Sequence, residues 1–276
     1  MDTLKRFLLV WVVGGFVVAG VALWQLPDRF FHIWFLNIGQ GDAVLIKTPE
    51  QHYILIDGGP GNTVMEELAA VMPFFVKELD LVVLTHPHAD HIDGLVEVLR
   101  RYRVKGVLLS GPNYSSSTYD QFLAEISDRD LPFWIAEMET DFRFGAVGFD
   151  VIYPFEQALA ENFGNVNNAS VALKVSYGDL KIMLTGDLEG EAEAELIANP
   201  YLDLRANILK AGHHGSRTSL TWDFLQKVKP DTVVIQSGKD NQFGHPHEET
   251  LKKLEKMGVE VRRNDLEGRV EFRYAQ

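Results

Sequence analysis

The segment Thr85-His86-Pro87-His88-Ala89-Asp90-His91 decides the fold of this 276-residue chain. It follows residues 81–84, a short apolar run typical of a buried strand, so its polar side chains lie where that strand ends. Three histidines and one carboxylate lie within six residues and supply the nitrogen and oxygen donors that Zn²⁺ or Mn²⁺ accepts. A lone histidine is usually structural, but so dense a group seldom arises by chance, so the segment predicts metal ligands.

The spacing within this segment suggests two metal ions. Alternate residues of an extended chain point the same way, so His86 and His88 can share one ion. Asp90 and His91 lie further round the turn and can face another. The chain has no cysteine, so any metal must be held by histidine and carboxylate, and disulfides and cysteine nucleophiles are excluded.

Strands and helices alternate along the rest of the chain, which predicts an α/β protein with a buried sheet. Apolar runs predict strands at 30–36, 43–47, 53–56, 81–84 and 107–109, and then at 171–175, 181–184, 208–209 and 232–235. Helical spacing predicts helices at 65–78, kinked at Pro73, at 92–102 and at 189–198.

The two halves of the chain repeat this order with similar spacings. From His86 to the next strand-ending serine is 24 residues, and the same count separates His213 from its own serine. Asp57 precedes the first of these histidines by 29 residues, and Asp187 precedes the second by 26. We therefore expect two pseudo-equivalent halves that each deliver an aspartate and a histidine to one shared edge. The alternative is that any two α/β halves look alike at this level of detail.

Short motifs elsewhere in the chain add to the histidine segment. They are Phe35-Leu36-Asn37-Ile38-Gly39-Gln40-Gly41-Asp42-Ala43, Leu55-Ile56-Asp57-Gly58-Gly59, Leu184-Thr185-Gly186-Asp187, Lys210-Ala211-Gly212-His213-His214-Gly215-Ser216 and Gly244-His245-Pro246. Together they resemble the metallo-β-lactamase superfamily, and in particular the C-terminal domain of ComEC-type competence proteins, from about Phe31 to the end of the chain. The resemblance implies an αβ/βα sandwich, a hydrolase domain over residues 27–276, and two divalent ions, with zinc as the first candidate and manganese as the second.

The resemblance also implies the ligand set. Asp187 would bridge both ions, because one carboxylate offers two oxygens. Metal one would have His86, His88 and Asp187, and metal two would have Asp90, His91, Asp187 and one member of the pair His213-His214.

The equal spacing favours His213 as that last ligand. His214 would then be a proton donor or a substrate contact, although the two assignments could be exchanged. Asp57 would orient ligands from behind, a role that carboxylates near metal sites commonly take. An aspartate in a glycine-rich turn is the alternative interpretation of Asp57.

No histidine lies between His91 and His213, so the third histidine that many superfamily members place on metal one is missing. Asn167, Asn168 and Ser170 occupy the corresponding stretch, as in the ComEC-like group. We expect these three residues to contact substrate beside an open metal position.

Loops at strand ends would complete the site. The candidate catalytic residues are Asp90, His214 and His245, and the further candidate substrate contacts are Lys210 and Ser216, with Arg217 and Lys239 beside them. The basic side chains of Lys210, Arg217 and Lys239 could face a phosphate group, although each one alone is more often a solvated loop residue.

Residues 1–26 predict a membrane anchor. After Lys5 and Arg6 come twenty uncharged, mostly apolar residues, 7–26, which match the thickness of a bilayer. The basic flank favours an N-terminus inside and a globular part outside, so we expect a single-pass protein with an extracytoplasmic domain. An uncleaved or cleaved signal peptide is the alternative, although the sequence around Ala22 is a poor cleavage context.

The net charge of −13 is unevenly distributed. Residues 1–204 contain 13 Lys+Arg and 29 Asp+Glu, whereas residues 205–276 contain 13 and 10. An acidic surface repels nucleic acid at long range, so an anionic substrate would be drawn in locally, by metal ions and by the basic C-terminal part. The alternative is a charge bias that serves only solubility.

We therefore expect a metal-dependent hydrolase in which metal-bound hydroxide attacks a phosphodiester, with nucleic acid outside the membrane as the substrate. A hydrolase of phosphocholine-type esters, or of thioesters or lactams, is an alternative within the same fold. A non-catalytic surface binding module is an alternative of another class. The intact ligand set argues against it, since a retired site readily loses costly buried groups. The sequence identifies no protein partner.

Overall fold

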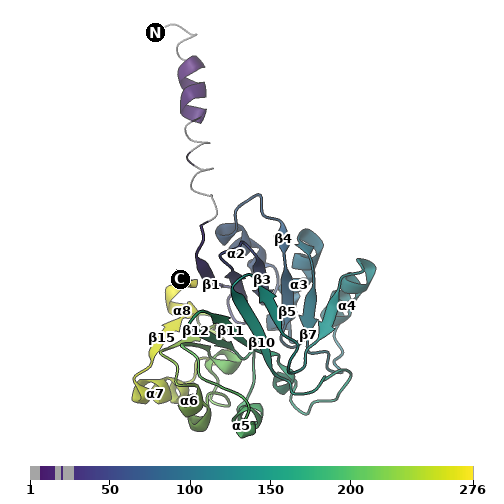
Figure 1. Cartoon of the computed structure of the whole chain (residues 1–276), viewed down its shortest axis with the longest axis vertical. Coiled ribbons are helices and arrows are strands. Elements are labelled where there is room, and N and C mark those ends of the chain that lie inside the picture. Colours follow the sequence, from purple (N-terminus) through teal and green to yellow (C-terminus); the bar gives the residue numbers. More distant parts are fainter. Residues whose placement is uncertain (1–6, 16–19, 21–27, 276) are drawn as a thin grey trace.

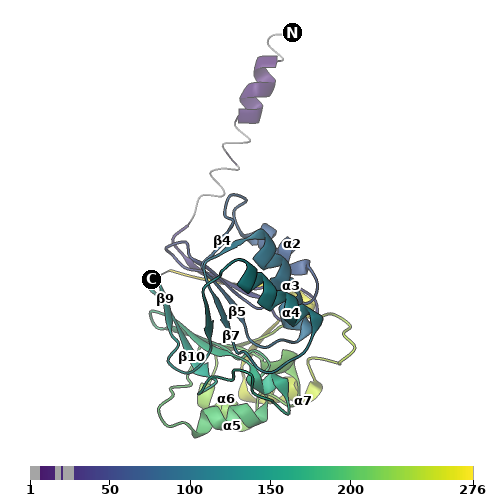
Figure 2. The same cartoon turned by 90° about the vertical axis from the view of Figure 1, so that its right-hand side faces the viewer.

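Two β-sheets packed face to face form the body of the molecule, with helices on both outer faces (Figures 1 and 2). The computed structural model describes residues 7–15, 20 and 28–275. The first sheet has the strand order β16-β1-β2-β3-β5-β7-β8, and the second has the order β15-β14-β13-β12-β11-β10-β9. This arrangement is the αβ/βα sandwich that the sequence predicts.

The elements have the following bounds. The first sheet contains β1 (Phe31–Phe35), β2 (Val44–Lys47), β3 (Tyr53–Ile56), β5 (Leu81–Leu84), β7 (Val107–Leu109), β8 (Phe133–Ile135) and β16 (Val270–Tyr274). The second contains β9 (Phe142–Phe144), β10 (Val147–Tyr153), β11 (Ala172–Tyr177), β12 (Leu180–Leu184), β13 (Ile208–Lys210), β14 (Thr232–Ile235) and β15 (Glu260–Arg263). The helices are α2 (Thr63–Val71), α3 (Ala89–Arg101) and α4 (Ser117–Asp128) on the first sheet, and α5 (Gly190–Ala198), α6 (Trp222–Val228) and α7 (Glu248–Met257) on the second. Shorter elements are the pair β4 (Glu78–Leu79) and β6 (Arg103–Val104), the 3₁₀ turns η1 (Val166–Ala169) and η2 (Gly212–Gly215), and α8 (Asn264–Glu267).

Strand β3 shows why the apolar runs become buried strands. Successive side chains point to opposite faces, so Leu55 packs beneath the helices while Ile54 and Ile56 pack between the two sheets. Both faces are covered, and every residue of the strand is therefore buried. The same division along the other strands produces three apolar clusters, one between the sheets and one under the helices of each half.

Each half is an antiparallel meander that leads into parallel strands. In the first half β1, β2 and β3 pair antiparallel, and β5, β7 and β8 then follow in parallel. In the second half β10, β11 and β12 pair antiparallel, and β13, β14 and β15 follow in parallel. The two halves thus share one order of pairings, as the spacings predict. The last strand, β16, pairs with β1 and ties the end of the chain to the first half.

Two predicted helices have different bounds. Helix α2 ends at Val71 and does not continue to residue 78, because Pro73 stops the helix instead of kinking it. Helix α3 begins at Ala89, before the predicted start, so Asp90 and His91 belong to its first turn. Residues 110–170, for which the sequence predicted no element, contain α4, β8, β9 and β10.

The predicted membrane anchor is contradicted by the structure. No helix in the described ranges is long and apolar enough to cross a membrane. Apart from residues 7–15 and 20, the predicted anchor lies outside the described residues. The expectation of a single-pass, membrane-anchored protein with an extracytoplasmic domain is therefore corrected.

A close backbone approach holds the β3 loop against α3. The Gly58 N–H donates to the His91 carbonyl oxygen at 2.7 Å, and the Gly94 N–H donates to the Gly59 carbonyl oxygen at 3.0 Å. A Cβ atom at Gly94 would lie 2.1 Å from the Gly58 carbonyl oxygen, so only glycine fits there. This contact brings Asp57, at the end of β3, beside the first turn of α3.

We expect Gly94→Ala to lower the free energy of unfolding by about 1–3 kcal/mol, because the added methyl group must push the β3 loop away from α3. Urea denaturation measures the change. Gly164→Ala is the matched control, since a Cβ atom there would meet nothing within 4 Å. Equal stability of the two variants would show that the loop yields without cost.

Candidate metal centre

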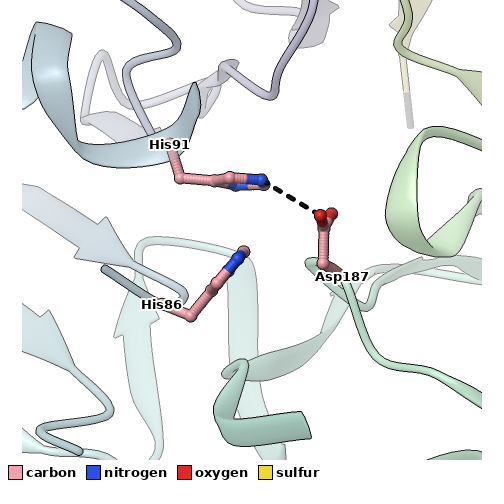
Figure 3. Close-up of side chains that lie close together, drawn as sticks. All are labelled: His86, His91 and Asp187. Atoms are coloured by element: carbon pink, nitrogen blue, oxygen red, sulfur yellow. Dashed lines mark ion pairs between the residues drawn. The ribbon is translucent and has the colours of Figure 1, made fainter. Parts of the chain in front are cut away.

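Loops that follow strand ends in both halves bring histidine and aspartate side chains together. The first half contributes Asp42 after β1, Asp57 after β3, His86 and His88 after β5, and Asp90 and His91 in the first turn of α3. The second half contributes Asp187 after β12 and His214 after β13. Figure 3 shows that His86, His91 and Asp187 point toward one another from separate elements.

Asp187 lies at the centre of this cluster. Its Oδ2 atom is 3.4 Å from His91 Nε2, the contact dashed in Figure 3, and 3.3 Å from His214 Nε2. His214 Nε2 also lies 3.1 Å from Asp90 Oδ2. One carboxylate therefore faces an imidazole from each half of the fold.

The donor atoms form overlapping groups of three, each within 4.8 Å. Two of them are His86 with His91 and Asp187, and Asp90 with His91 and His214. His88 is adjacent to the first group, because its Nδ1 atom is 3.0 Å from His86 Nε2. The two groups have His91 in common.

Several buried polar atoms of the cluster have no hydrogen-bond partner among the described residues. They are His91 Nε2, Asp187 Oδ1 and Asp42 Oδ1. Buried polar atoms are nearly always satisfied, so unsatisfied atoms gathered at one place indicate a ligand that binds there. Imidazole nitrogens and carboxylate oxygens without sulfur suit Zn²⁺ or Mn²⁺. The residues present therefore fit a divalent metal ion.

The carboxylates determine which histidines carry a proton when no metal is bound. Burial acts to lower the pKa of His91, but carboxylates led by Asp187 outweigh it and raise the pKa well above its usual range. Burial also acts to lower the pKa of His214, but Asp187 and Asp42 outweigh it and raise this pKa well above its usual range. Burial and the neighbouring His91 hold the pKa of His86 well below its usual range, so His86 is a neutral imidazole. The cluster therefore attracts positive charge, as protons or as metal.

Hydrogen bonds behind the cluster fix which ring nitrogen faces its centre. His91 Nδ1 donates to Asp57 Oδ2 at 2.8 Å, and the Thr85 hydroxyl donates to the same oxygen at 2.7 Å. His214 Nδ1 donates to the Gln236 carbonyl oxygen at 3.1 Å. Both rings therefore turn Nε2 inward. Asp57 makes the contact expected of a carboxylate that orients a ligand.

The structure brings His214, and not His213, into the cluster, so the assignment drawn from the equal spacing is corrected by one residue. His214 is 1% exposed. His213 Nδ1 lies instead 2.9 Å from Glu189 Oε1 and 3.4 Å from Asn167 Nδ2. Both histidines have left-handed backbone angles, with φ of 45° and 53°, so the chain forms a tight turn and not an extended strand end like that before His86. The spacing measured in the first half therefore does not predict which of the two histidines points into the cluster.

Lys210 differs from the expectation that it contacts substrate. Its side chain is buried, with 1% exposed, and its amine forms ion pairs with Asp42 and, at 3.5 Å to Oδ1, with Asp187. The amine also donates to the Gly186 carbonyl oxygen at 2.8 Å. Lys210 thus faces the carboxylates from inside the fold and does not reach a loop surface.

Ser170 and Ser216 also differ from the expectation that they contact substrate. Ser170 Oγ accepts the Asp187 N–H at 3.0 Å and lies 3.2 Å from His86 Nδ1, so it holds two members of the cluster from behind. Ser216 Oγ is hydrogen-bonded to Thr218 Oγ1 at 2.9 Å. Both serines are buried, and their hydroxyls are hydrogen-bonded within the protein.

The remaining predicted residues lie around the cluster. Asn167 and Asn168 are buried, and their amides donate to Glu189 at 2.9 Å and Glu191 at 3.3 Å. The ring of His245 is 5.3 Å from that of His213 and 6.1 Å from that of His214. Arg217 and Lys239 are exposed on the loops that follow β13 and β14.

Sequence reasoning gave no role to three residues near the cluster. They are Asp42, which pairs with Lys210, Glu189, which contacts His213, and Tyr114, whose ring lies 5.6 Å from that of His88. Asp42 could have been found, because it ends the quoted Gly39-Gln40-Gly41-Asp42 motif. No local pattern marks Glu189 or Tyr114, since their contacts join distant segments.

Comparison with known proteins agrees with this geometry. Residues 36–238 match the family described as "Metallo-beta-lactamase superfamily". ComE operon protein 3 of Bacillus subtilis is 29% identical over 87% of this chain and 32% of its own length, and Competence protein ComA of Neisseria gonorrhoeae is 28% identical over 90% and 33%. Recombination protein 2 of Haemophilus influenzae is 27% identical over 91% of this chain and 30% of its own length. The chain therefore spans about a third of the length of these relatives.

Solved structures share the fold. The metallo-beta-lactamase fold protein YhfI from Bacillus subtilis superposes with a TM-score of 0.57 at 12% identity, covering 89% of this chain and 100% of that one. The metallo hydrolase Igni18 from Ignicoccus hospitalis superposes with a TM-score of 0.55 at 16% identity, covering 88% and 100%. At these identities the likeness shows the fold alone.

We expect His214→Ala to weaken metal binding by at least about 10–100-fold, and His213→Ala to leave it unchanged, because only His214 turns a nitrogen toward Asp187. Metal content after dialysis and titration with Zn²⁺ or Mn²⁺ measure both. Loss of metal from His213→Ala with retention by His214→Ala would restore the assignment drawn from the spacing.

Metal binding should release protons. The raised pKa values of His91 and His214 mean that both rings are protonated near neutral pH without metal, and a metal must displace those protons. We therefore expect the affinity to fall as the pH falls, by roughly tenfold per pH unit for each proton released. Calorimetric titration in buffers of different ionisation enthalpy counts the protons. A heat of binding that is the same in every buffer would contradict this expectation.

Proposed function

Because this chain belongs to the metallo-β-lactamase superfamily of metal-dependent hydrolases, we propose that it hydrolyses phosphodiesters, with nucleic acid as the substrate class. The observation that carries the proposal is the position of Asp187 between imidazoles from the two halves, beside His86 and Asp90. A shared carboxylate of this kind is what a pair of divalent ions needs.

The proposed centre holds two ions, with zinc as the first candidate and manganese as the second. His86, His88 and Asp187 would hold one ion, and Asp90, His91, His214 and Asp187 the other. His214 replaces His213 in this set, because His214 turns a nitrogen toward Asp187 whereas His213 contacts Glu189. When bound, the metals supply a water of lowered pKa and positive charge for the oxygens of the phosphate.

Residues beside the ligands would bind and orient the substrate. Burial and the neighbouring His214 lower the pKa of His245 to about 4, so it is a neutral imidazole at pH 7. His245 Nδ1 is buried without a hydrogen-bond partner among the described residues, and the ring can therefore bond to a substrate oxygen. His213 with Glu189, and Asn167 beside them, form a second polar group at this edge.

Two observations support nucleic acid over other phosphodiesters. Relatives over most of this chain are named for competence and recombination. The part of the chain from residue 205 has an excess of basic over acidic residues, 13 against 10, although the whole chain is acidic. Exposed Arg217 and Lys239 belong to this part and lie on loops beside the cluster. Local positive charge of this kind binds phosphates where long-range attraction is absent.

We expect Asp187→Asn to lower the hydrolysis of bis(p-nitrophenyl) phosphate by more than about 100-fold, because the change removes a charged oxygen that both ions would share. Activity with added Mn²⁺ or Zn²⁺ and metal content per chain are measured together. Asp179→Asn, in the exposed turn between β11 and β12, is the control and should keep full activity.

Two results would count against the proposal. Full activity of Asp187→Asn would remove Asp187 from the centre. Turnover of a thioester, a lactam or a phosphocholine ester by the wild type, without turnover of any oligonucleotide, would assign another substrate class to the same centre.

A further inference from the structure

The loop between β14 and α7 carries an exposed aromatic ring next to the metal centre. Phe243 is 52% exposed, and within the described residues it belongs to none of the three apolar clusters. Its ring is stacked on that of His245, with centroids 5.8 Å apart and planes 25° apart. His245 in turn lies 6.1 Å from His214. The ring of His245 therefore lies between Phe243 and His214, a residue that we propose as a metal ligand.

Hydrogen bonds within the loop hold Phe243 in this place. Asn241 Oδ1 accepts the N–H of Phe243 at 3.1 Å and the N–H of His245 at 3.0 Å. Asn241 Nδ2 donates to the Gly238 carbonyl oxygen at 2.9 Å. The backbone of the loop thus sets the position of the ring, and no apolar packing is needed to fix it. A ring held in advance loses little conformational freedom when a ligand binds.

Two basic residues, Arg217 and Lys239, belong to the segments next to Phe243. The Arg217 N–H donates to His247 Nδ1 at 3.0 Å, so the turn after His214 is joined to the loop that carries Phe243. Arg217 and Lys239 are both exposed, and neither forms an ion pair with another residue in the described part of the chain. Arg101 and Lys252, which are also exposed, are paired with glutamates, whereas Lys227 and Lys256 have, like Arg217 and Lys239, no ion-pair partner in the described part of the chain. Arg217 and Lys239 are therefore free to pair with phosphates.

An exposed ring flanked by free basic side chains suits a flexible, unpaired nucleic acid strand. Every nucleobase has a π face, so stacking on an aromatic side chain is tolerant of sequence, while the basic residues track the backbone. In a duplex the faces of each base are covered by its neighbours, and a base must be unstacked before it can reach such a ring. About half of Phe243, 52%, is exposed, so part of its ring is accessible to a base.

We propose that Phe243, backed by His245, is the stacking surface for an unpaired nucleobase next to the phosphate that is cleaved. The substrate is then single-stranded nucleic acid, or a single-stranded end, in preference to an intact duplex. This inference rests on the proposed phosphodiesterase function and specifies its substrate.

The test compares Phe243→Ala and Phe243→Trp with the wild type, all as the full chain loaded with the metal that gives most activity. The substrates are a short fluorescent oligothymidine, the same strand with abasic residues, and a matched duplex. Phe243→Ala should raise KM for the oligothymidine by roughly tenfold with little change in kcat, as expected for the loss of one stacked base. Phe243→Trp should keep the wild-type KM. On the abasic strand the wild type should already bind weakly, and Phe243→Ala should add no further loss.

Phe75→Ala is the matched control, because Phe75 is 55% exposed on the loop between α2 and β4, at the far ends of the strands from the centre. Fluorescence anisotropy of the oligothymidine in EDTA gives a second readout that does not depend on turnover, and the melting temperature checks that each variant folds.

The experiments distinguish a failure of the proposed phosphodiesterase function from a failure of the stacking surface. If the wild type cleaves no nucleic acid with any metal, the proposed function fails. If the wild type cleaves oligothymidine but Phe243→Ala keeps its KM and its anisotropy titration, or if a duplex is cleaved as well as the single strand, the stacking surface is wrong while the phosphodiesterase function stands.

Discussion

Four aspartate side chains meet at the edge that the two sheets share, and three of them, Asp42, Asp57 and Asp187, are almost fully buried. Buried carboxylates are strongly destabilising unless positive charge lies beside them. Lys210 supplies one fixed charge from inside, and its pKa is raised, against the effect of burial, by Asp42 and Asp187. Protonated histidines or metal ions can balance the remaining negative charge. The fold around this edge therefore depends on positive charge beside these carboxylates, from Lys210 together with protonated histidines or a metal ion.

This dependence links the two halves of the molecule. The first half supplies most of the imidazoles and the second supplies Asp187 and His214, and three of the four candidate donor groups among the described residues combine side chains from both halves. The sheets must pack at a fixed distance for the groups to meet. The apolar cluster between the sheets sets that distance, and the glycine contact holds the β3 loop against α3 within the first half. Hydrogen bonds that His91 donates to Asp57 and His214 donates to the Gln236 carbonyl oxygen then turn the rings inward.

The cluster and its surroundings have different electrostatic character. The cluster itself is acidic and buried, which suits cations, whereas the loops that follow β13 and β14 are exposed and carry Arg217, Lys239 and the ring of Phe243. A phosphodiester placed between them would meet metal charge on one side and basic side chains on the other. The acidity of the whole chain therefore does not conflict with an anionic substrate, because screening by salt limits charge effects to about 8–10 Å.

The sequence by itself determined the class of fold, many of the strands and the donor residues of the centre. Continuous apolar runs such as Leu81–Leu84 can only be strands covered on both faces, and three histidines beside an aspartate leave few roles other than metal binding. These signals are local, so a single sequence carries them. The order of the strands in the two sheets was not predicted from the sequence and is seen only in the structure.

The tertiary structure decided which of two adjacent histidines joins the centre, because the left-handed turn at His213 and His214 shifts the side chains by one position relative to any count along the chain. It also decided the burial of Lys210 and Ser170 and the partnership of Lys210 with Asp42, which join residues far apart in sequence. A run of apolar residues near the N-terminus predicted a membrane anchor, and the described helices contain no segment of the required length. Composition records how apolar a segment is, but only the folded backbone shows how long a helix it forms and which side chains it brings together.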